Sequence, residues 1–102
     1  MAWTQFWDMH SGGRTKIGEF GRIYIEAPEK RAIEVFRKRF KRDPLNVTCD
    51  CCGEDYAIYE SETLEEATQF DRVRVGKPST VDGYLEANKS TVLVIRASEF
   101  EP

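Results

Sequence analysis

The chain has 102 residues and a mass of 11.8 kDa, which is enough for one hydrophobic core and too little for two domains. Its 15 basic and 18 acidic side chains give a net charge of −3, so the whole molecule has no positive field that would hold nucleic acid or an anionic membrane. The apolar run at 92–95 is far shorter than the roughly 18 residues of a membrane-spanning helix. We therefore expect one soluble domain, 1–102, in the cytoplasm of the cell that makes it, with no membrane or nucleic-acid partner.

The first half of the chain predicts two strands and a helix. Large and polar side chains alternate over 2–7, and a strict alternation rich in β-branched and aromatic residues covers 22–26. Between them the segment 8–21 has four glycines and little apolar character, which indicates a long Gly-rich loop. Pro28 suits the first turn of a helix, which we expect over 28–41. Its core-facing side chains, which recur at helical spacing, are Ala32, Ile33, Phe36 and Phe40.

The last forty residues predict two short helices and a strand. The sequence at 63–66 has the form of a capping box, so a helix should begin there and run through Phe70. We expect a brief extended stretch at 72–75 and a further helix over 80–87. The segment 91–96 is apolar at four successive positions, which is typical of a strand buried on both faces.

The central segment predicts a hairpin, and with it a fold. Two strand candidates, 46–49 and 56–60, flank a cysteine-rich turn at 49–55. With the first strand set aside, the order strand, helix, strand, strand, helix, strand is that of the split βαβ, or ferredoxin-like, arrangement. We therefore expect an α+β domain: an antiparallel sheet of four to five strands with helices on one face. The last strand would then lie at an edge, where the N-terminal strand could become its neighbour.

The cysteine turn is a candidate metal site. Three cysteines within four positions, Cys49, Cys51 and Cys52, suit a metal in a reducing compartment better than a disulfide framework. The spacing of Cys49 and Cys52, followed by Gly53, is that of half a zinc site. Cys51 and His10, or a nearby carboxylate, are candidates for the missing ligands. Zinc held by these four residues is one interpretation, and reduced thiols packed in a tight turn are a second. A strained disulfide between the adjacent Cys51 and Cys52 is the third.

The loop after the first strand is a candidate ligand site. Its Ser-Gly-Gly sequence offers backbone amides beside aromatic side chains, which could receive a small anionic or nucleotide-like ligand. The alternative is a connector below core tryptophans. The candidate ligand-binding residues are Trp7, His10, Ser11, Gly12, Gly13 and Tyr56. The basic run at 37–42 is typical of a solvated helix end, where positive charge also complements the helix dipole.

Three segments of the chain carry a resemblance to a known family: WTQFWDMHSGG at 3–13, IYIEAPE at 23–29 and VTCDCCGEDY at 47–56. Together with the closing VLVI and ASE, they resemble a family of small uncharacterised proteins encoded by tailed bacteriophages of actinobacteria. Arg14 stands where that family often has a third glycine. The stretch 71–80 is shorter than the family's equivalent. The resemblance implies a phage accessory protein acting in the cytoplasm of the bacterial host, and it implies no particular activity.

These observations predict a non-enzymatic accessory protein that binds a host protein or interferes with host metabolism or defence, stabilised by zinc. The first alternative is a binding protein for a nucleotide-type signal, using the loop residues named above. A thiol or metal-dependent enzyme is the weaker alternative, because the sequence offers His10 as a base for Cys51 or Cys52 but no orienting group and no oxyanion site.

Overall fold

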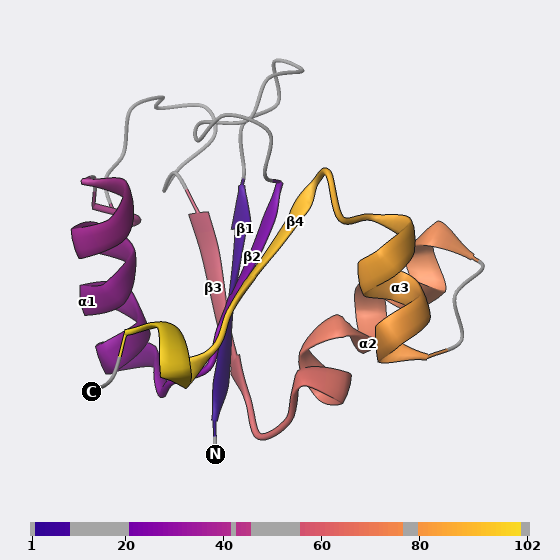
Figure 1. Ribbon diagram of the computed structural model, residues 1–102, viewed down its shortest axis with the longest axis horizontal. Coiled ribbons are helices and arrows are strands. Elements are labelled where there is room, and N and C mark those ends of the chain that lie inside the picture. The colour runs from indigo at the N-terminus through magenta and orange to yellow at the C-terminus, as the bar shows by residue number, and fades with distance from the viewer. Residues whose placement is uncertain (1, 9–20, 42, 46–55, 77–79, 101–102) are drawn as a thin grey trace.

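The computed structural model describes residues 2–8, 21–41, 43–45, 56–76 and 80–100 (Figure 1). In chain order the elements are β1 (Trp3–Asp8), β2 (Arg22–Ile25), α1 (Glu29–Phe40), β3 (Tyr56–Ser61), α2 (Leu64–Val75), α3 (Val81–Ala87), β4 (Val92–Ile95) and a 3-10 turn, η1 (Ala97–Glu99). Within these ranges no helix has the length and apolar character needed to cross a membrane.

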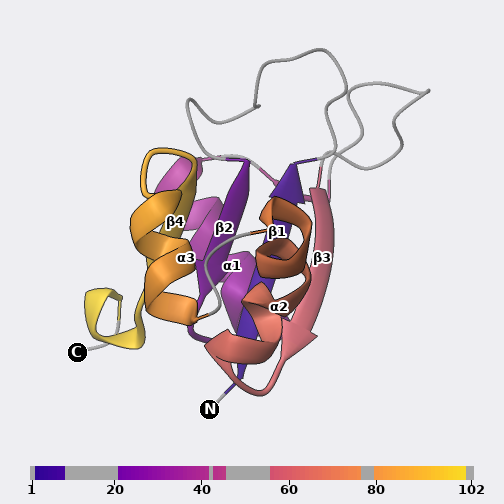
Figure 2. The same cartoon turned by 90° about the vertical axis from the view of Figure 1, so that its right-hand side faces the viewer.

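The four strands form one mixed sheet in the order β3-β1-β2-β4. Strand β1 lies inside the sheet and pairs antiparallel with both β2 and β3. Strand β2 pairs parallel with β4, so that Arg22 lies opposite Val92 and Ile25 lies opposite Ile95. Figure 2 shows this order face-on, with β1 and β2 inside the sheet and β3 and β4 at its edges.

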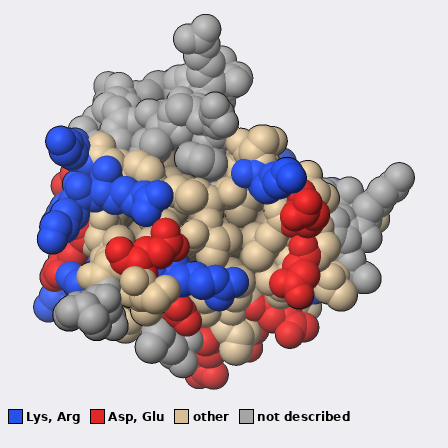
Figure 3. Space-filling view, in the orientation of Figure 1, with Lys and Arg blue, Asp and Glu red and all other residues tan. Residues whose placement is uncertain are grey.

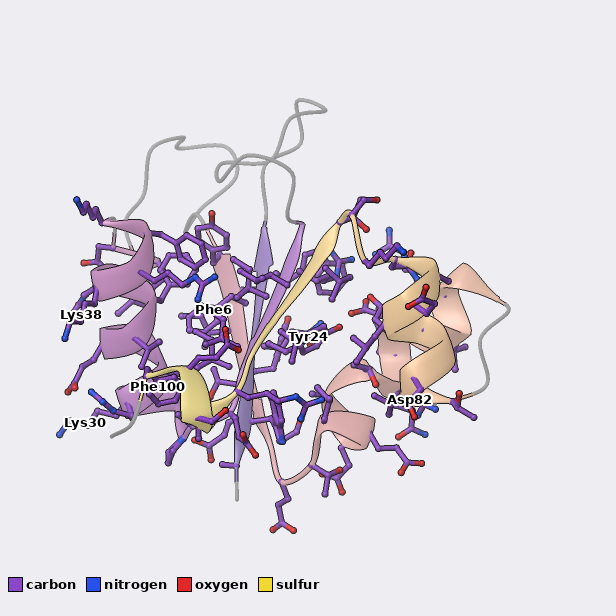
Figure 4. The ribbon with its side chains drawn as sticks, viewed as in Figure 1. Phe6, Tyr24, Lys30, Lys38, Asp82 and Phe100 are labelled. Carbon is purple, nitrogen blue, oxygen red and sulfur yellow. The ribbon has the colours of Figure 1, made fainter. Side chains whose placement is uncertain are left out.

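Helices cover both faces of the sheet. Figure 1 shows the sheet edge-on, with α1 on one side and α2 and α3 on the other. Phe6, Ile23 and Ile25 belong to the core under α1, whereas Trp3 and Tyr24 belong to the core under α2 and α3. Phe6 and Tyr24 accordingly lie on opposite sides of the strands in Figure 4. Successive side chains of β1 and β2 thus point to opposite faces of the sheet and belong to two separate apolar layers.

Helix α1 confirms the predicted helix and its apolar face. Ala32 and Phe36 are fully buried, and Ile33 and Phe40 are partly buried against the same core. The Phe36 ring lies 4.7 Å from the ring of Phe6 and 4.8 Å from that of Phe40 (centroid to centroid). The helix ends at Lys41, whose φ of 55° places it in the left-handed region that terminates helices.

Helix α2 begins as predicted and ends later. The Thr63 hydroxyl accepts a hydrogen bond from the Glu66 amide at 3.1 Å. The helix continues to Val75 and stops at Gly76, where φ is 81°. The predicted extended stretch at 72–75 is therefore wrong, since no helix-breaking residue comes before Gly76. Helix α3 is capped by Thr80, whose hydroxyl accepts from the Gly83 amide at 3.0 Å.

The α+β class and the four strands are confirmed, but three details of the predicted fold are wrong. The sheet is not wholly antiparallel, because β2 and β4 run parallel. Its helices lie on both faces, because β2 buries the three successive residues Ile23, Tyr24 and Ile25, and such a strand needs cover on both sides. The N-terminal strand is not the neighbour of the last strand but lies between β2 and β3. A ferredoxin-like arrangement, which leaves β1 aside, is accordingly not confirmed. The predicted strand 46–49 lies outside the described residues.

Candidate functional site

A buried polar network lies between the sheet and α2. Asp71, which is 2% exposed, points from α2 onto strands β1 and β2. Its Oδ2 accepts hydrogen bonds from Gln5 Nε2 at 2.7 Å and from the Tyr24 hydroxyl at 2.5 Å. Its Oδ1 accepts from Arg22 Nε at 3.1 Å. Each carboxylate oxygen is therefore compensated by at least one donor, as a buried charge requires.

Two tyrosines complete this Asp71 network. Burial raises the pKa of Tyr24, and the hydrogen bond to the Asp71 carboxylate raises it further. Burial also raises the pKa of Tyr84, whose hydroxyl interacts with Tyr24. Both hydroxyls are therefore neutral at pH 7, and Tyr24 is held as a donor to Asp71.

A cavity of about 320 Å³ opens beside the Asp71 network, where β2 and β4 begin. This volume lies at the lower end of the range of pockets that hold small molecules, about 300 to 1,000 Å³. Its walls come from β2, β4, α2, α3 and the segments next to them, and are formed by Gly21, Arg22, Asp71, Arg74, Tyr84, Asn88, Thr91 and Val92.

The guanidinium groups of two arginines that line this cavity, Arg22 and Arg74, lie near the Trp7 ring. The register of β1 and β2 places Trp7 directly opposite Arg22, and the Arg22 guanidinium carbon lies 3.9 Å from the Trp7 ring centroid. The guanidinium carbon of Arg74, from α2, lies 5.3 Å from the same ring. Such stacking orients a guanidinium group and leaves its edge free for hydrogen bonds.

The same indole ring, which is half-buried, and three exposed side chains form a group that we call the aromatic surface: Trp7, Tyr59, Phe70 and Val73. The Phe70 ring lies 5.8 Å from the Trp7 ring, and Val73 follows one turn later on α2. Tyr59 pairs with Gln5, two residues from Trp7, so the two aromatic side chains share a face of the sheet. Tyr59, Phe70 and Val73 are 53, 61 and 76% exposed.

A larger cavity, of about 610 Å³, lies between α1 and η1. Lys and Arg side chains gather over α1 in Figure 3, and Lys30 and Lys38 point outward in Figure 4. The arginines of this cavity are paired, however: Arg31 with Glu34 at 3.1 Å and Arg39 with Glu99 at 3.7 Å. Both guanidinium groups of the larger cavity are therefore neutralised, and Lys38 is the remaining cation of its lining.

The structure describes two of the predicted site residues, and it places them apart. Trp7 lies on the face covered by α2, whereas Tyr56 is buried under α1, with its ring 5.0 Å from the Phe36 ring. The other ligand candidates, His10, Ser11, Gly12 and Gly13, lie outside the described residues, as do the metal candidates Cys49, Cys51 and Cys52. In the part that is described, no three His, Cys, Asp or Glu side chains group in a way that could hold a metal ion.

Sequence reasoning missed Asp71 and Arg74. Both fall where the sequence predicts the end of a helix and an extended stretch, so neither was placed on a helix face. One signal was present: Asp71 follows Ala67 and Thr68 at helical spacing, and all three are buried in the structure. A carboxylate on such a face indicates a buried polar partner.

Comparisons of the chain with protein-family models, with curated proteins and with solved structures give no match.

Proposed function

We propose that this protein is a phage accessory protein without catalytic activity, which binds a host protein through the aromatic surface. The observation that carries the proposal is the exposure of Tyr59, Phe70 and Val73 in a group around Trp7. Large apolar side chains that gather at a protein surface commonly mark a binding site, and aromatic residues are enriched in such sites. The resemblance to actinobacteriophage proteins supplies the setting, the cytoplasm of the bacterial host.

The test uses the chain as bait in a lysate of an actinobacterial host. We compare the wild type with the double variant Phe70→Ser/Val73→Ser and with Leu45→Ser. Leu45 is a matched control, because it is also apolar and 43% exposed but does not belong to the aromatic surface. We expect one host protein to bind the wild type and Leu45→Ser and to be lost from the double variant. Retention of that protein by a folded double variant would contradict the proposal.

The predicted alternative, a nucleotide-type ligand at the loop, stays a prediction. Its described members, Trp7 and Tyr56, lie on opposite faces of the sheet, and one face of the Trp7 ring already carries Arg22. A nucleotide that co-purifies with the protein and is lost from Gly12→Val would support this alternative. The thiol or metal enzyme also stays a prediction, and a host substrate turned over by the wild type but not by Cys52→Ser would support it.

A further inference from the structure

We propose that the cavity beside Asp71 binds a phosphate-bearing small molecule, with Arg22 and Arg74 contacting the phosphate group. The proposed site needs neither the loop residues 10–13 nor the binding of a host protein. It therefore goes beyond the function proposed above.

Arg22 is fixed in place before any ligand arrives. Its Nε donates to Asp71 Oδ1 at 3.1 Å, and its Nη1 donates to the carbonyl oxygen of Gly21 at 3.1 Å. The Trp7 ring supports the guanidinium plane from one side. Since a guanidinium group carries five N–H donors, these two hydrogen bonds leave three for a ligand. An arginine held in this way loses little conformational freedom when it binds an anion.

Arg74 adds a positive charge that the described residues do not balance. Asp71 compensates Arg22, whereas Arg74 forms no ion pair within the described part of the chain. Both arginines line the same cavity, so one anion bound there could contact both groups. Two cations at one small cavity repel each other, and an anion bound there would relieve the repulsion. Guanidinium groups favour phosphate because two parallel N–H groups match two phosphate oxygens.

The rest of the cavity has room for a small polar group of the ligand that is attached to the phosphate. A volume of about 320 Å³ has room for about ten water-sized groups, so a phosphate fills only part of it. The remaining walls include the side chains of Tyr84, Asn88 and Thr91, whose hydroxyl and amide groups can bond a hydroxylated ligand. The Asp71 carboxylate also lines the cavity, but both of its oxygens already accept hydrogen bonds. The larger cavity beside α1 also has one unbalanced cation, Lys38, but both of its guanidinium groups are paired with carboxylates, so it offers no unpaired guanidinium group to a phosphate.

The experiment titrates the purified protein at constant ionic strength with inorganic phosphate, with a hexose monophosphate and with succinate. Binding is followed by calorimetry and by the Nε–H NMR signals of the arginines. We expect both phosphate compounds to bind saturably, with a Kd of about 1 mM or tighter, and to shift the signals of Arg22 and Arg74. Succinate should bind at least about tenfold more weakly, because it lacks the phosphate geometry.

Variants then locate the site. Arg74→Gln should weaken phosphate binding about tenfold or more, since it removes charged hydrogen bonds, and should leave the melting temperature unchanged, because Arg74 is exposed. Arg74→Lys should bind with intermediate affinity, because it keeps the charge and loses the paired donors. Lys38→Gln, an equal loss of charge on α1, should bind as the wild type does.

Four results would overturn the proposal, and the first three are no saturable binding of either phosphate compound, Arg74→Gln binding as tightly as the wild type, and succinate binding as tightly as the phosphate compounds. The first two results would show that the cavity is not a phosphate site. The third would show that it binds anions without preference for phosphate. Loss of binding in Lys38→Gln would also overturn it, because the effect would then reflect net charge.

Discussion

The carboxylate of Asp71 is held away from water by α2, and its charge is tolerated because Gln5, Tyr24 and Arg22 all donate to it. The network ties α2 to two strands that lie far from it in the sequence. A hydrogen-bonded group of this kind fixes the position of the helix over the sheet more specifically than apolar contacts do, because each donor has one geometry that satisfies it.

The first prediction concerns Asp71→Asn. The new amide group would face the Gln5 amide donor, and Arg22 would lose its counter-charge, so unfolding free energy should fall by about 2 to 4 kcal/mol. Denaturant unfolding measures the loss. The control is Asp82→Asn, an exposed carboxylate on α3, which should change stability by less than about 0.5 kcal/mol. Equal losses in the two variants would show that the network does not stabilise the fold.

The second prediction concerns alkaline pH. Because the pKa values of Tyr24 and Tyr84 are raised in the folded protein, the unfolded chain releases these protons first, above about pH 10. The stabilisation is therefore complete below that pH and is lost as pH rises above it, by up to about 1.4 kcal/mol per pH unit for each tyrosine.

The variant Tyr24→Phe distinguishes the stability lost through ionisation of Tyr24 from the stability that its hydrogen bond contributes at pH 7. The variant should be less stable than the wild type at pH 7, since Asp71 loses a donor, by about 1 to 3 kcal/mol. Between pH 10 and 11 its stability should fall less steeply than that of the wild type. Urea unfolding at a series of pH values gives both quantities. Parallel curves for the two proteins would show that Tyr24 ionises equally in both states.

The helices and strands show which parts of the fold a sequence can predict. Helix α1 was predictable because its apolar residues repeat at helical spacing between Pro28 and the polar residues after Phe40. The partners of each strand were not predictable, because the pairing of Ile25 with Ile95 depends on contacts between distant segments. The helices α2 and α3 on the second face of the sheet had one local signal, the successive residues Ile23, Tyr24 and Ile25 of β2. Because the Tyr24 side chain carries a hydroxyl group, the same segment also fits a strand with one face in water.

The third prediction tests the packing of α1. Phe36→Ala removes a ring that contacts Phe6, Phe40 and Tyr56, and should reduce unfolding free energy by about 3 to 5 kcal/mol. Lys38→Ala, two residues later on the exposed side, should cost less than about 0.5 kcal/mol. A loss below about 1 kcal/mol for Phe36→Ala would mean that α1 packs through another face.

At the scale of the whole molecule, the candidate site was the least predictable part. The sequence directed attention to the cysteines and the Gly-rich loop, which lie outside the described residues. The cavity instead combines Arg22 from β2, Arg74 from α2 and Tyr84 from α3. None of these side chains forms a sequence motif with another, so only the fold brings them together.

The fourth prediction concerns zinc and rests on the spacing of the cysteines alone. Protein expressed with zinc available should retain about one ion per chain, held by Cys49 and Cys52 with Cys51 or His10. A chelator should then lower the melting temperature, and Cys52→Ser should abolish both the metal and the effect of the chelator. Elemental analysis that finds well under one equivalent in fresh, reduced protein would leave the cysteines as ordinary thiols.

The parallel pairing of β2 with β4 has a consequence for synthesis on the ribosome. The chain emerges from its N-terminus, so β1, β2 and α1 are available long before β4. Until β4 arrives, one edge of β2 keeps its backbone donors and acceptors unpaired beside the apolar side chains of Ile23 and Ile25. The nascent chain must pass through this stage, in which an open strand edge can pair with another chain. We therefore expect nascent chains to be prone to aggregation when they are close together, as on crowded polysomes.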